Sequence, residues 1–158
     1  MAIAPNTTFV SGAILTAAQQ NAFGFSTMQL ATSTTTYVLT GSDATATGMS
    51  VSFTALANRN YKITYYEPEI KMTNTGLIIL TIRRTSGTPA QLQGATISSP
   101  TSSGANYASA TVTYVGTFSA GTVTLTGTAS TTNTGATPQL DRSATLVATL
   151  LVEDIGPA

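Results

Sequence analysis

The pair Glu67 and Glu69 comes closest, by residue type and spacing, to a constellation that could do chemistry. Residues two apart in an extended segment share one face, with Cα atoms about 6.5–7 Å apart, close to the carboxyl separation of inverting glycosidases. Lys71 lies on the same face, however, and Arg83 or Arg84 can oppose it from the next strand. Such charges pair across strands for modest stability or for register. We therefore interpret these residues as ion pairs at an interface between subunits: Glu67, Glu69, Lys71 and Arg83.

Other catalytic designs lack the residues they need. The chain contains no His, Cys or Trp, so nucleophilic triads, thiol chemistry and zinc sites built on imidazole or thiolate are excluded. No glycine-rich phosphate loop follows a predicted strand and opens a helix, so nucleotide binding has no motif. The missing Trp also removes one ring on which a sugar could stack. The sequence predicts no catalytic residues, no cofactor and no metal.

The composition favours a subunit that associates with others. Charged residues make up 8% of the 158-residue chain, against about 25% in an ordinary domain, while Thr and Ser together make up about 30%. The formal net charge is zero, so little electrostatic repulsion keeps copies apart. A secreted protein that tolerates a neutral surface is the alternative. The few scattered cations predict no nucleic-acid partner. No export signal or membrane span is visible, so we expect synthesis in the cytoplasm and no membrane partner.

Most of the chain alternates apolar and polar residues with a period of two, which is typical of strands. The clearest case is residues 49–56, where Met49, Val51, Phe53 and Ala55 fall on one face. Loops are expected at residues 41–48 and 128–138, and residues 77–80 are expected to be buried on both faces. The expected strands are residues 36–40, 49–56, 61–66, 77–84, 95–98, 110–118, 121–127 and 144–152. The pattern predicts an all-β fold, an antiparallel jelly-roll-like sandwich of about eight strands.

The N-terminal segment has a different pattern. Residues 1–27 read as an anchoring arm with one short helix at residues 17–23, begun by a capping box of Thr16 and Gln19. Residues 28–158 read as the β-sandwich domain. So short a helix needs a surface on which to dock. The arm's apolar residues are the predicted assembly contacts: Ile3, Phe9, Val10, Ile14 and Leu15.

Two further patterns suggest surface roles. Residues 122–128 place four Thr on one face of a strand, with Val123 and Leu125 on the other. Such an array could bind ice or another repeating surface, but a solvated strand face over a core is the favoured interpretation. Tyr61 and Tyr65 share one face and Tyr66 points the other way, for which we expect core or interface roles.

Three segments carry a resemblance to a known group. Residues 9–22 (FVSGAILTAAQQNA), 53–64 (FTALANRNYKIT) and 150–156 (LLVEDIG) resemble segments of structural proteins from tailed bacteriophages. They cover about a quarter of the chain. The resemblance implies a virion protein with a jelly-roll-like or C1q-like β-sandwich, usually homotrimeric. The group includes head decoration (cement) proteins and minor tail or fibre proteins, and it has no catalytic residues to transfer.

A cement protein is the favoured reading of these options. The chain has one compact domain and a short arm, with no segment for an elongated fibre shaft. We therefore expect a homotrimer in the virion that contacts the major capsid protein. Two alternatives stay open. One is a minor tail, tail-fibre or baseplate protein that contacts tail proteins and the host surface. The other is a bacterial adhesin or pilus-like module.

Overall fold

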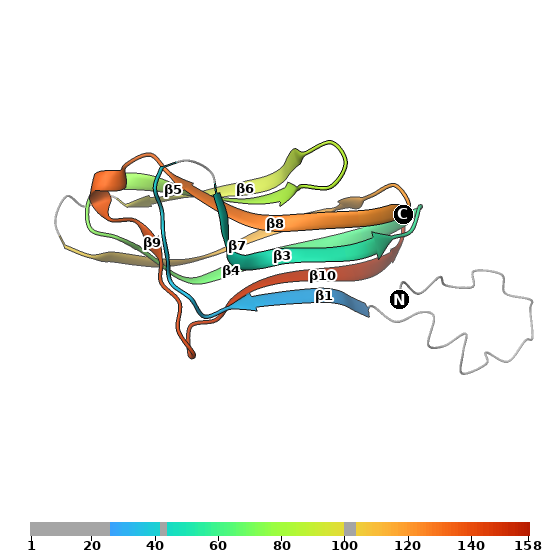
Figure 1. Cartoon of the computed structure of the whole chain (residues 1–158), viewed down its shortest axis with the longest axis horizontal. Coiled ribbons are helices and arrows are strands. Elements are labelled where there is room, and N and C mark those ends of the chain that lie inside the picture. Colours follow the sequence, from blue (N-terminus) through green and yellow to red (C-terminus); the bar gives the residue numbers. More distant parts are fainter. Residues whose placement is uncertain (1–25, 42–43, 100–103) are drawn as a thin grey trace, which may run out of the picture.

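The computed structural model describes residues 26–41, 44–99 and 104–158. These residues form ten strands and one short 3₁₀ helix, η1 (Thr134–Ala136). The strands make two antiparallel sheets that lie face to face (Figure 1). The predicted all-β sandwich is therefore confirmed. The predicted helix at residues 17–23 lies outside the described residues.

The first sheet contains six strands and the second contains four. The first consists of β1 (Ser26–Ser33), β10 (Ala148–Pro157), β4 (Arg59–Met72) and β7 (Asn106–Thr117), extended at one end by the two-residue strands β9 (Gln139–Leu140) and β2 (Tyr37–Val38). The second consists of β3 (Ala44–Ala55), β8 (Gly121–Thr131), β5 (Gly76–Arg84) and β6 (Ala90–Ser99), in that order. We call them the six-stranded sheet and the four-stranded sheet.

The connectivity is that of a jelly roll. Apart from the two-residue strands, the first long strand pairs with the last (β1 with β10) and the second with the seventh (β3 with β8). The third pairs with the sixth (β4 with β7) and the fourth with the fifth (β5 with β6). This nested pairing, wrapped into two sheets, is the jelly-roll arrangement of eight strands. The prediction of a jelly-roll-like sandwich of about eight strands is confirmed.

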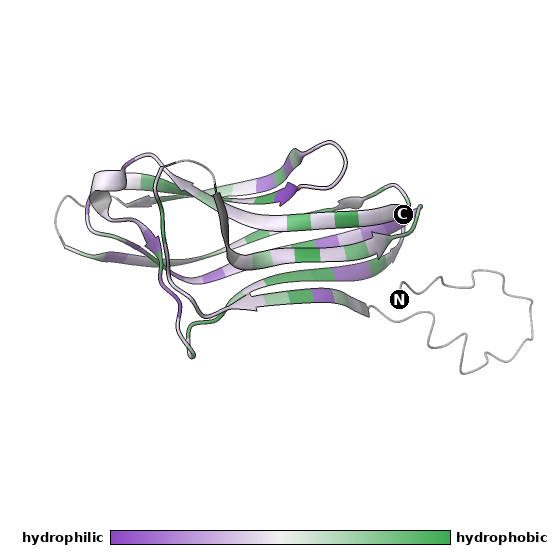
Figure 2. Ribbon diagram, in the orientation of Figure 1, coloured by the Kyte–Doolittle hydropathy of each residue, from purple (hydrophilic) through white to green (hydrophobic). Residues whose placement is uncertain are grey.

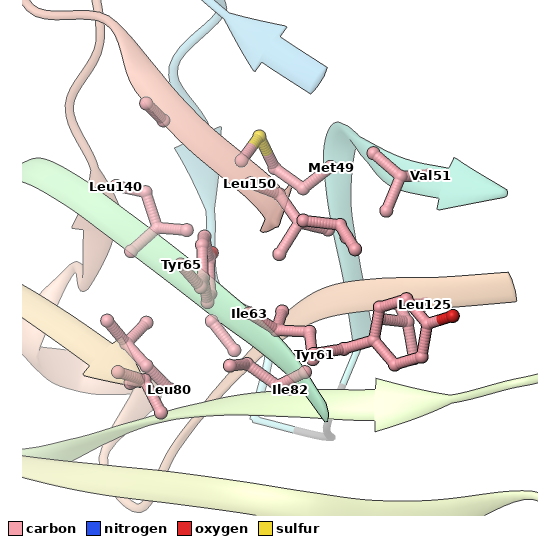
Figure 3. Close-up of a cluster of buried hydrophobic side chains, with 14 of the residues drawn as sticks. Met49, Val51, Tyr61, Ile63, Tyr65, Leu80, Ile82, Leu125, Leu140 and Leu150 are labelled. Atoms are coloured by element: carbon pink, nitrogen blue, oxygen red, sulfur yellow. The ribbon is translucent and has the colours of Figure 1, made fainter. Parts of the chain in front are cut away.

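Alternation along the strands fills the space between the sheets. Tyr61, Ile63 and Tyr65 of β4 are fully buried, while the residues between them are partly exposed. In Figure 3 side chains from both sheets point toward one another, among them Leu150 of β10 and Leu125 of β8. One end of the core is aromatic, with ring centroids 5.2–5.9 Å apart among Phe53, Tyr61 and Phe118. Such tilted and edge-on ring pairs add to the stabilisation from burial.

Several predicted boundaries are wrong. The loop expected at residues 41–48 ends early, since β3 begins at Ala44, and the loop expected at residues 128–138 begins late, since β8 continues to Thr131. The polar residues in both places pair with neighbouring strands, which local composition does not reveal. Strand β1, rich in Ser and Thr, was not predicted. Residues 77–80 are not buried on both faces, because Leu77 is 36% exposed.

Candidate functional site

The carboxylate pair considered above does not form. β4 has an irregularity between Glu67 and Ile70, so that Pro68 and Glu69 together oppose a single residue of β7. The extra residue breaks the alternation. Glu67 continues the inward alternation of the preceding residues and is fully buried, while the extra residue leaves Glu69 partly exposed. The expectation that the two glutamates share a face is wrong, and Glu67 is out of reach of a dissolved substrate.

Glu67 binds an arginine that the sequence analysis did not single out. Arg142, which follows β9, donates from Nε to Oε2 of Glu67 at 3.0 Å and from Nη2 to Oε1, and both side chains are fully buried. The Tyr65 hydroxyl also donates to Oε1 of Glu67, at 2.5 Å. Arg83 lies on β5 in the opposite sheet, so it cannot oppose Glu67 from the next strand of the same sheet. The three groups of this Tyr65–Glu67–Arg142 cluster satisfy one another in a site without water access.

Burial raises the pKa of the Tyr65 hydroxyl well above its ordinary value, and the neighbouring Glu67 carboxylate raises it further. Arg142 acts in the opposite direction, through its charge and its hydrogen bonding. The hydroxyl therefore stays protonated and keeps donating to Glu67 into alkaline conditions. This is the pattern of a structural hydrogen bond.

A second buried ion pair lies at the opposite end of β4. Arg59 donates from Nε to Oδ2 of Asp154 at 3.0 Å and from Nη2 to Oδ1 at 2.6 Å. The backbone N–H of Gly156 adds a third hydrogen bond to Oδ1, at 3.1 Å. Arg59 is 5% exposed and Asp154 is fully buried. The pair holds the start of β4 against the end of β10. Each of the two buried ion pairs therefore has one partner on β4.

The other predicted interface residues lie apart from Glu67. The ammonium of Lys71 lies 5.8 Å from the ring centroid of Tyr107, a cation–π contact between β4 and β7. Glu69 contributes its backbone carbonyl, which accepts from the N–H of Asp141 at 2.8 Å. Arg83 is partly buried on β5. The interface role of Glu69, Lys71 and Arg83 stays a prediction.

Among the described residues, one cavity is small and another is open to solvent. A cavity of about 120 Å³ lies between β6 and the paired strands β4 and β7, lined by Ile70, Met72, Ile97 and Tyr107 among others. Small-molecule sites are usually about 300–1,000 Å³ and mainly apolar. A larger depression of about 520 Å³ at the end of the sandwich, beside Arg84 and Phe118, has mostly polar walls. Neither has the enclosed apolar shape of a small-molecule site.

The outer face of the four-stranded sheet is lined with hydroxyl groups. Val123 and Leu125 point into the core, as predicted, and Thr124 between them points outward. These hydroxyls bond within the sheet: Thr124 to Ser52 at 2.8 Å and Thr81 to Thr128 at 2.5 Å. Figure 2 shows the corresponding pale bands of intermediate hydropathy along β3 and β8. Since Thr126 and Thr128 are themselves buried, this face is not a regular array of free hydroxyls.

Large apolar side chains are exposed on the outer face of the six-stranded sheet. Leu30 of β1 is 54% exposed, Val115 of β7 is 55% exposed and Tyr107 of β7 is 58% exposed. Tyr107 and Val115 lie toward the two ends of one strand, on the same side of it. Exposed apolar side chains on strands at the limits of a sheet suit contact with another chain.

The predicted arm contacts Ile3, Phe9, Val10, Ile14 and Leu15 lie outside the described residues. β1 begins at Ser26, inside the last residues of the predicted arm (1–27), and Ser26 pairs with Asp154 of β10. Figure 1 shows the start of β1 and the C-terminus at the same end of the sandwich. The arm is therefore attached at that end.

Metal and membrane features can be judged for the described ranges only. Within residues 26–41, 44–99 and 104–158, no three Asp or Glu side chains are grouped so that they could hold a metal ion. That part of the chain also has no helix long and apolar enough to cross a membrane.

No protein-family model matches the sequence, and no curated protein matches it. The function is therefore argued from the fold, the surface and the resemblance of the three segments.

Arg59, Arg142 and Asp154 are structural residues that sequence reasoning missed. Asp154 had a local signal, because it continues the inward positions Ala148, Leu150 and Val152. A carboxylate at an inward position demands a cation. Arg142 had no such signal, because it lies outside the strands.

Proposed function

We propose that this protein is a non-enzymatic structural component of a tailed-bacteriophage virion. It decorates the outer surface of the head as a homotrimer, binds the major capsid protein and stabilises the shell. The observation that carries this proposal is the distribution of charge on the sandwich. Among the strands, charged residues occur only on β4, β5 and β10. Of the five other long strands, which are uncharged, four are the edge strands of the two sheets. A surface with so little repulsion suits a subunit that packs against neighbours.

The proposed mechanism is mass action. A protein that binds the assembled shell and not its separated subunits stabilises the shell by its binding free energy. A trimer contacts the shell at three places, so each contact can be weak while the whole attachment is strong. No catalytic step is needed, and the buried state of Glu67 agrees with a structural role.

The arm supplies the anchor in this proposal. Residues 1–25 contain the apolar side chains Ile3, Phe9, Val10, Ile14 and Leu15, and they join the sandwich at Ser26, on an outer strand of the six-stranded sheet. The arm can therefore reach a neighbouring surface without crossing the domain. The sandwich then projects outward from the shell.

A tail position is the second candidate, and Tyr107 favours it. This ring is 58% exposed beside Lys71, at the end of β7 that follows residues 100–105. An aromatic ring with a neighbouring cation can contact a host glycan or protein. In that role the protein would be a minor tail, tail-fibre or baseplate component.

Immunogold electron microscopy of intact particles tests the location. Label spread over the heads supports the cement proposal, and label confined to the tail tip replaces it with the tail proposal. Absence of label from all particles overturns both.

Deleting residues 1–25 tests the anchor. The shortened protein should keep the mass of the full-length oligomer and its β circular dichroism spectrum, but it should no longer sediment with particles that lack the native protein. Particle binding at full-length affinity would contradict the anchoring role. A matched variant in which only Ile3, Phe9, Val10, Ile14 and Leu15 become Ser separates apolar contact from arm length.

A further inference from the structure

The four long edge strands of the two sheets contain no charged residue and no proline. They are β1 and β7 in the six-stranded sheet, and β3 and β6 in the four-stranded sheet. Every second residue of such a strand turns its N–H and C=O groups away from its one partner, which leaves them open to another chain. Soluble monomers usually protect these edges with charged residues, prolines, bulges or a covering segment.

Three of these edges are interrupted. β1 has an extra residue at Met28 relative to β10, and β6 has one at Leu92 relative to β5. β3 is displaced more strongly, between Thr45 and Ser50, relative to β8. Bulges of this kind bend and twist a strand, which hinders the pairing of its open side with another strand.

β7 is different from the other three. In its pairing with β4 the additional residue lies on β4, at Pro68 and Glu69, while β7 runs from Asn106 to Thr117 without an insertion. Among the described residues, β7 is therefore the one long edge strand that is regular, uncharged and free of proline. Within the same ranges, its open side pairs with no other strand.

We propose that β7 pairs in antiparallel fashion with β7 of a second copy of this chain, so that the two six-stranded sheets become one continuous sheet. The same strand on both sides makes the contact two-fold symmetric, which closes it at two partners and prevents open-ended growth. This inference rests on the strand edges and not on the proposed virion function. In the proposed trimers, all three β7 strands of one trimer pair with those of a single second trimer, which closes the assembly at six chains.

The exposed apolar residues of β7 assign its register. When Thr111 lies on the two-fold axis, Tyr107 of one copy is directly opposite Val115 of the other, at both ends of the contact. Aromatic and β-branched residues form favourable cross-strand pairs. These two side chains are 58% and 55% exposed in the isolated chain, and this register brings each into contact with the other. Asn106 pairs with Gly116 at the limits of the contact, and every cross-strand pair is uncharged.

Disulfide cross-linking tests the register, and the native chain contributes no cysteine of its own. In Thr111→Cys the two cysteines are directly opposite, with Cα atoms roughly 4.5–5.5 Å apart, which is within disulfide range. In the matched variant Thr113→Cys each cysteine faces Ser109 of the other copy, and the two cysteines are about 13 Å apart along the strand, too far to bridge. Both positions are exposed on the same strand. Under mild oxidation the first variant should form a covalent dimer, and the second should not.

Solution mass tests the contact itself. Multi-angle light scattering should give the wild type twice the mass of Thr111→Lys/Thr113→Lys, because four like charges then meet on adjacent strands. The control Thr96→Lys/Ser98→Lys puts the same charges at the same spacing on exposed positions of the bulged strand β6, and it should keep the wild-type mass. Circular dichroism confirms that both variants fold.

The outcomes separate this inference from the proposed trimer. If the Thr111→Lys/Thr113→Lys variant is a monomer and the wild type is a dimer, the pairing is supported and the proposed trimer is overturned. Equal masses for wild type and the β7 variant overturn the pairing, whatever that mass is. Cross-linking of both cysteine variants alike, of neither, or of Thr113→Cys alone overturns the assigned register.

Discussion

The inner strands and the edge strands of this sandwich use charge in opposite ways. Of the four long inner strands, β4, β5 and β10 each carry at least two charged residues and β8 carries none, and two ion pairs made by β4 are buried. The edge strands β1, β3, β6 and β7 carry none. Natural sheets usually place charge at their edges, where it prevents association. The difference shows that charge here fixes the interior, while the periphery is left free to make contacts.

The buried pairs bind distant parts of the chain together. Glu67 and Arg142 join β4 to the segment after β9, and Arg59 and Asp154 join β4 to β10. Buried pairs add little net stability relative to well-packed apolar residues, but losing one partner leaves a charge without compensation. We therefore hypothesise that the buried ion pairs act mainly by making other arrangements of the strands unfavourable. Double-variant cycles measure how strongly the two partners of each pair are coupled.

The largest effect is expected from Arg142→Met. This change leaves the Glu67 carboxylate buried without its cation, which should lower the free energy of unfolding by about 3–5 kcal/mol. Urea denaturation at one fixed protein concentration measures it, because self-association also shifts apparent stability. The double variant Glu67→Gln/Arg142→Met removes the buried charge and should recover part of the loss. A double variant as unstable as the sum of both single changes would show that the pair does not couple.

Tyr65→Phe comes next. Loss of the hydrogen bond to Glu67 should cost about 1.5–3 kcal/mol at neutral pH, because the acceptor is charged. The raised pKa of Tyr65 also predicts a pH effect. Above pH 10 the unfolded chain releases this proton while the folded chain keeps it, so stability falls with rising pH until the folded-state pKa is reached.

The Phe variant should lose that part of the alkaline slope, at most about 1.4 kcal/mol per pH unit. Urea titrations from pH 8 upward, with wild type and variant side by side, measure it. An unchanged slope would place the alkaline sensitivity elsewhere.

Two glycines compare an inner strand with an edge strand. A Cβ at Gly127 of β8 would lie 2.9–3.0 Å from the ring of buried Tyr65, which Glu67 and the core hold in place. Gly127→Ala should therefore cost about 1–3 kcal/mol. A Cβ at Gly116 of β7 would meet the hydroxyl end of Tyr114, a half-buried side chain that can rotate away. Thermal unfolding should show a smaller loss for Gly116→Ala. The reverse order would mean that the edge is packed as rigidly as the interior.

The smallest effect belongs to the partly exposed pair Lys62 and Glu153. Their charged atoms are 3.3 Å apart, and the side chain of Lys62 is 44% exposed. Lys62→Met should change stability by less than about 1 kcal/mol, because solvent screens such pairs. Urea denaturation in low and high salt checks this. A loss as large as that of Arg142→Met would remove the distinction between buried and exposed charge.

Local periodicity predicted much of the fold and little of the ion-pair network. The alternation placed Met49, Val51, Phe53 and Ala55 on one face, and that face is buried in the core. The same reasoning placed Glu67 and Glu69 on one face, because it could not foresee the extra residue at Pro68. It also assigned polar residues 128–131 to a loop, although they pair with β5.

The sequence by itself determined the β class, the inward positions of the clear strands and the near absence of charge. These are local properties, since burial alternates with the period of the strand and composition needs no structure. Only the tertiary structure decided that β7 is a regular edge, and that Glu67 lies against Arg142, 75 residues away. The order of strands in a sheet depends on contacts between distant segments, which no local pattern encodes.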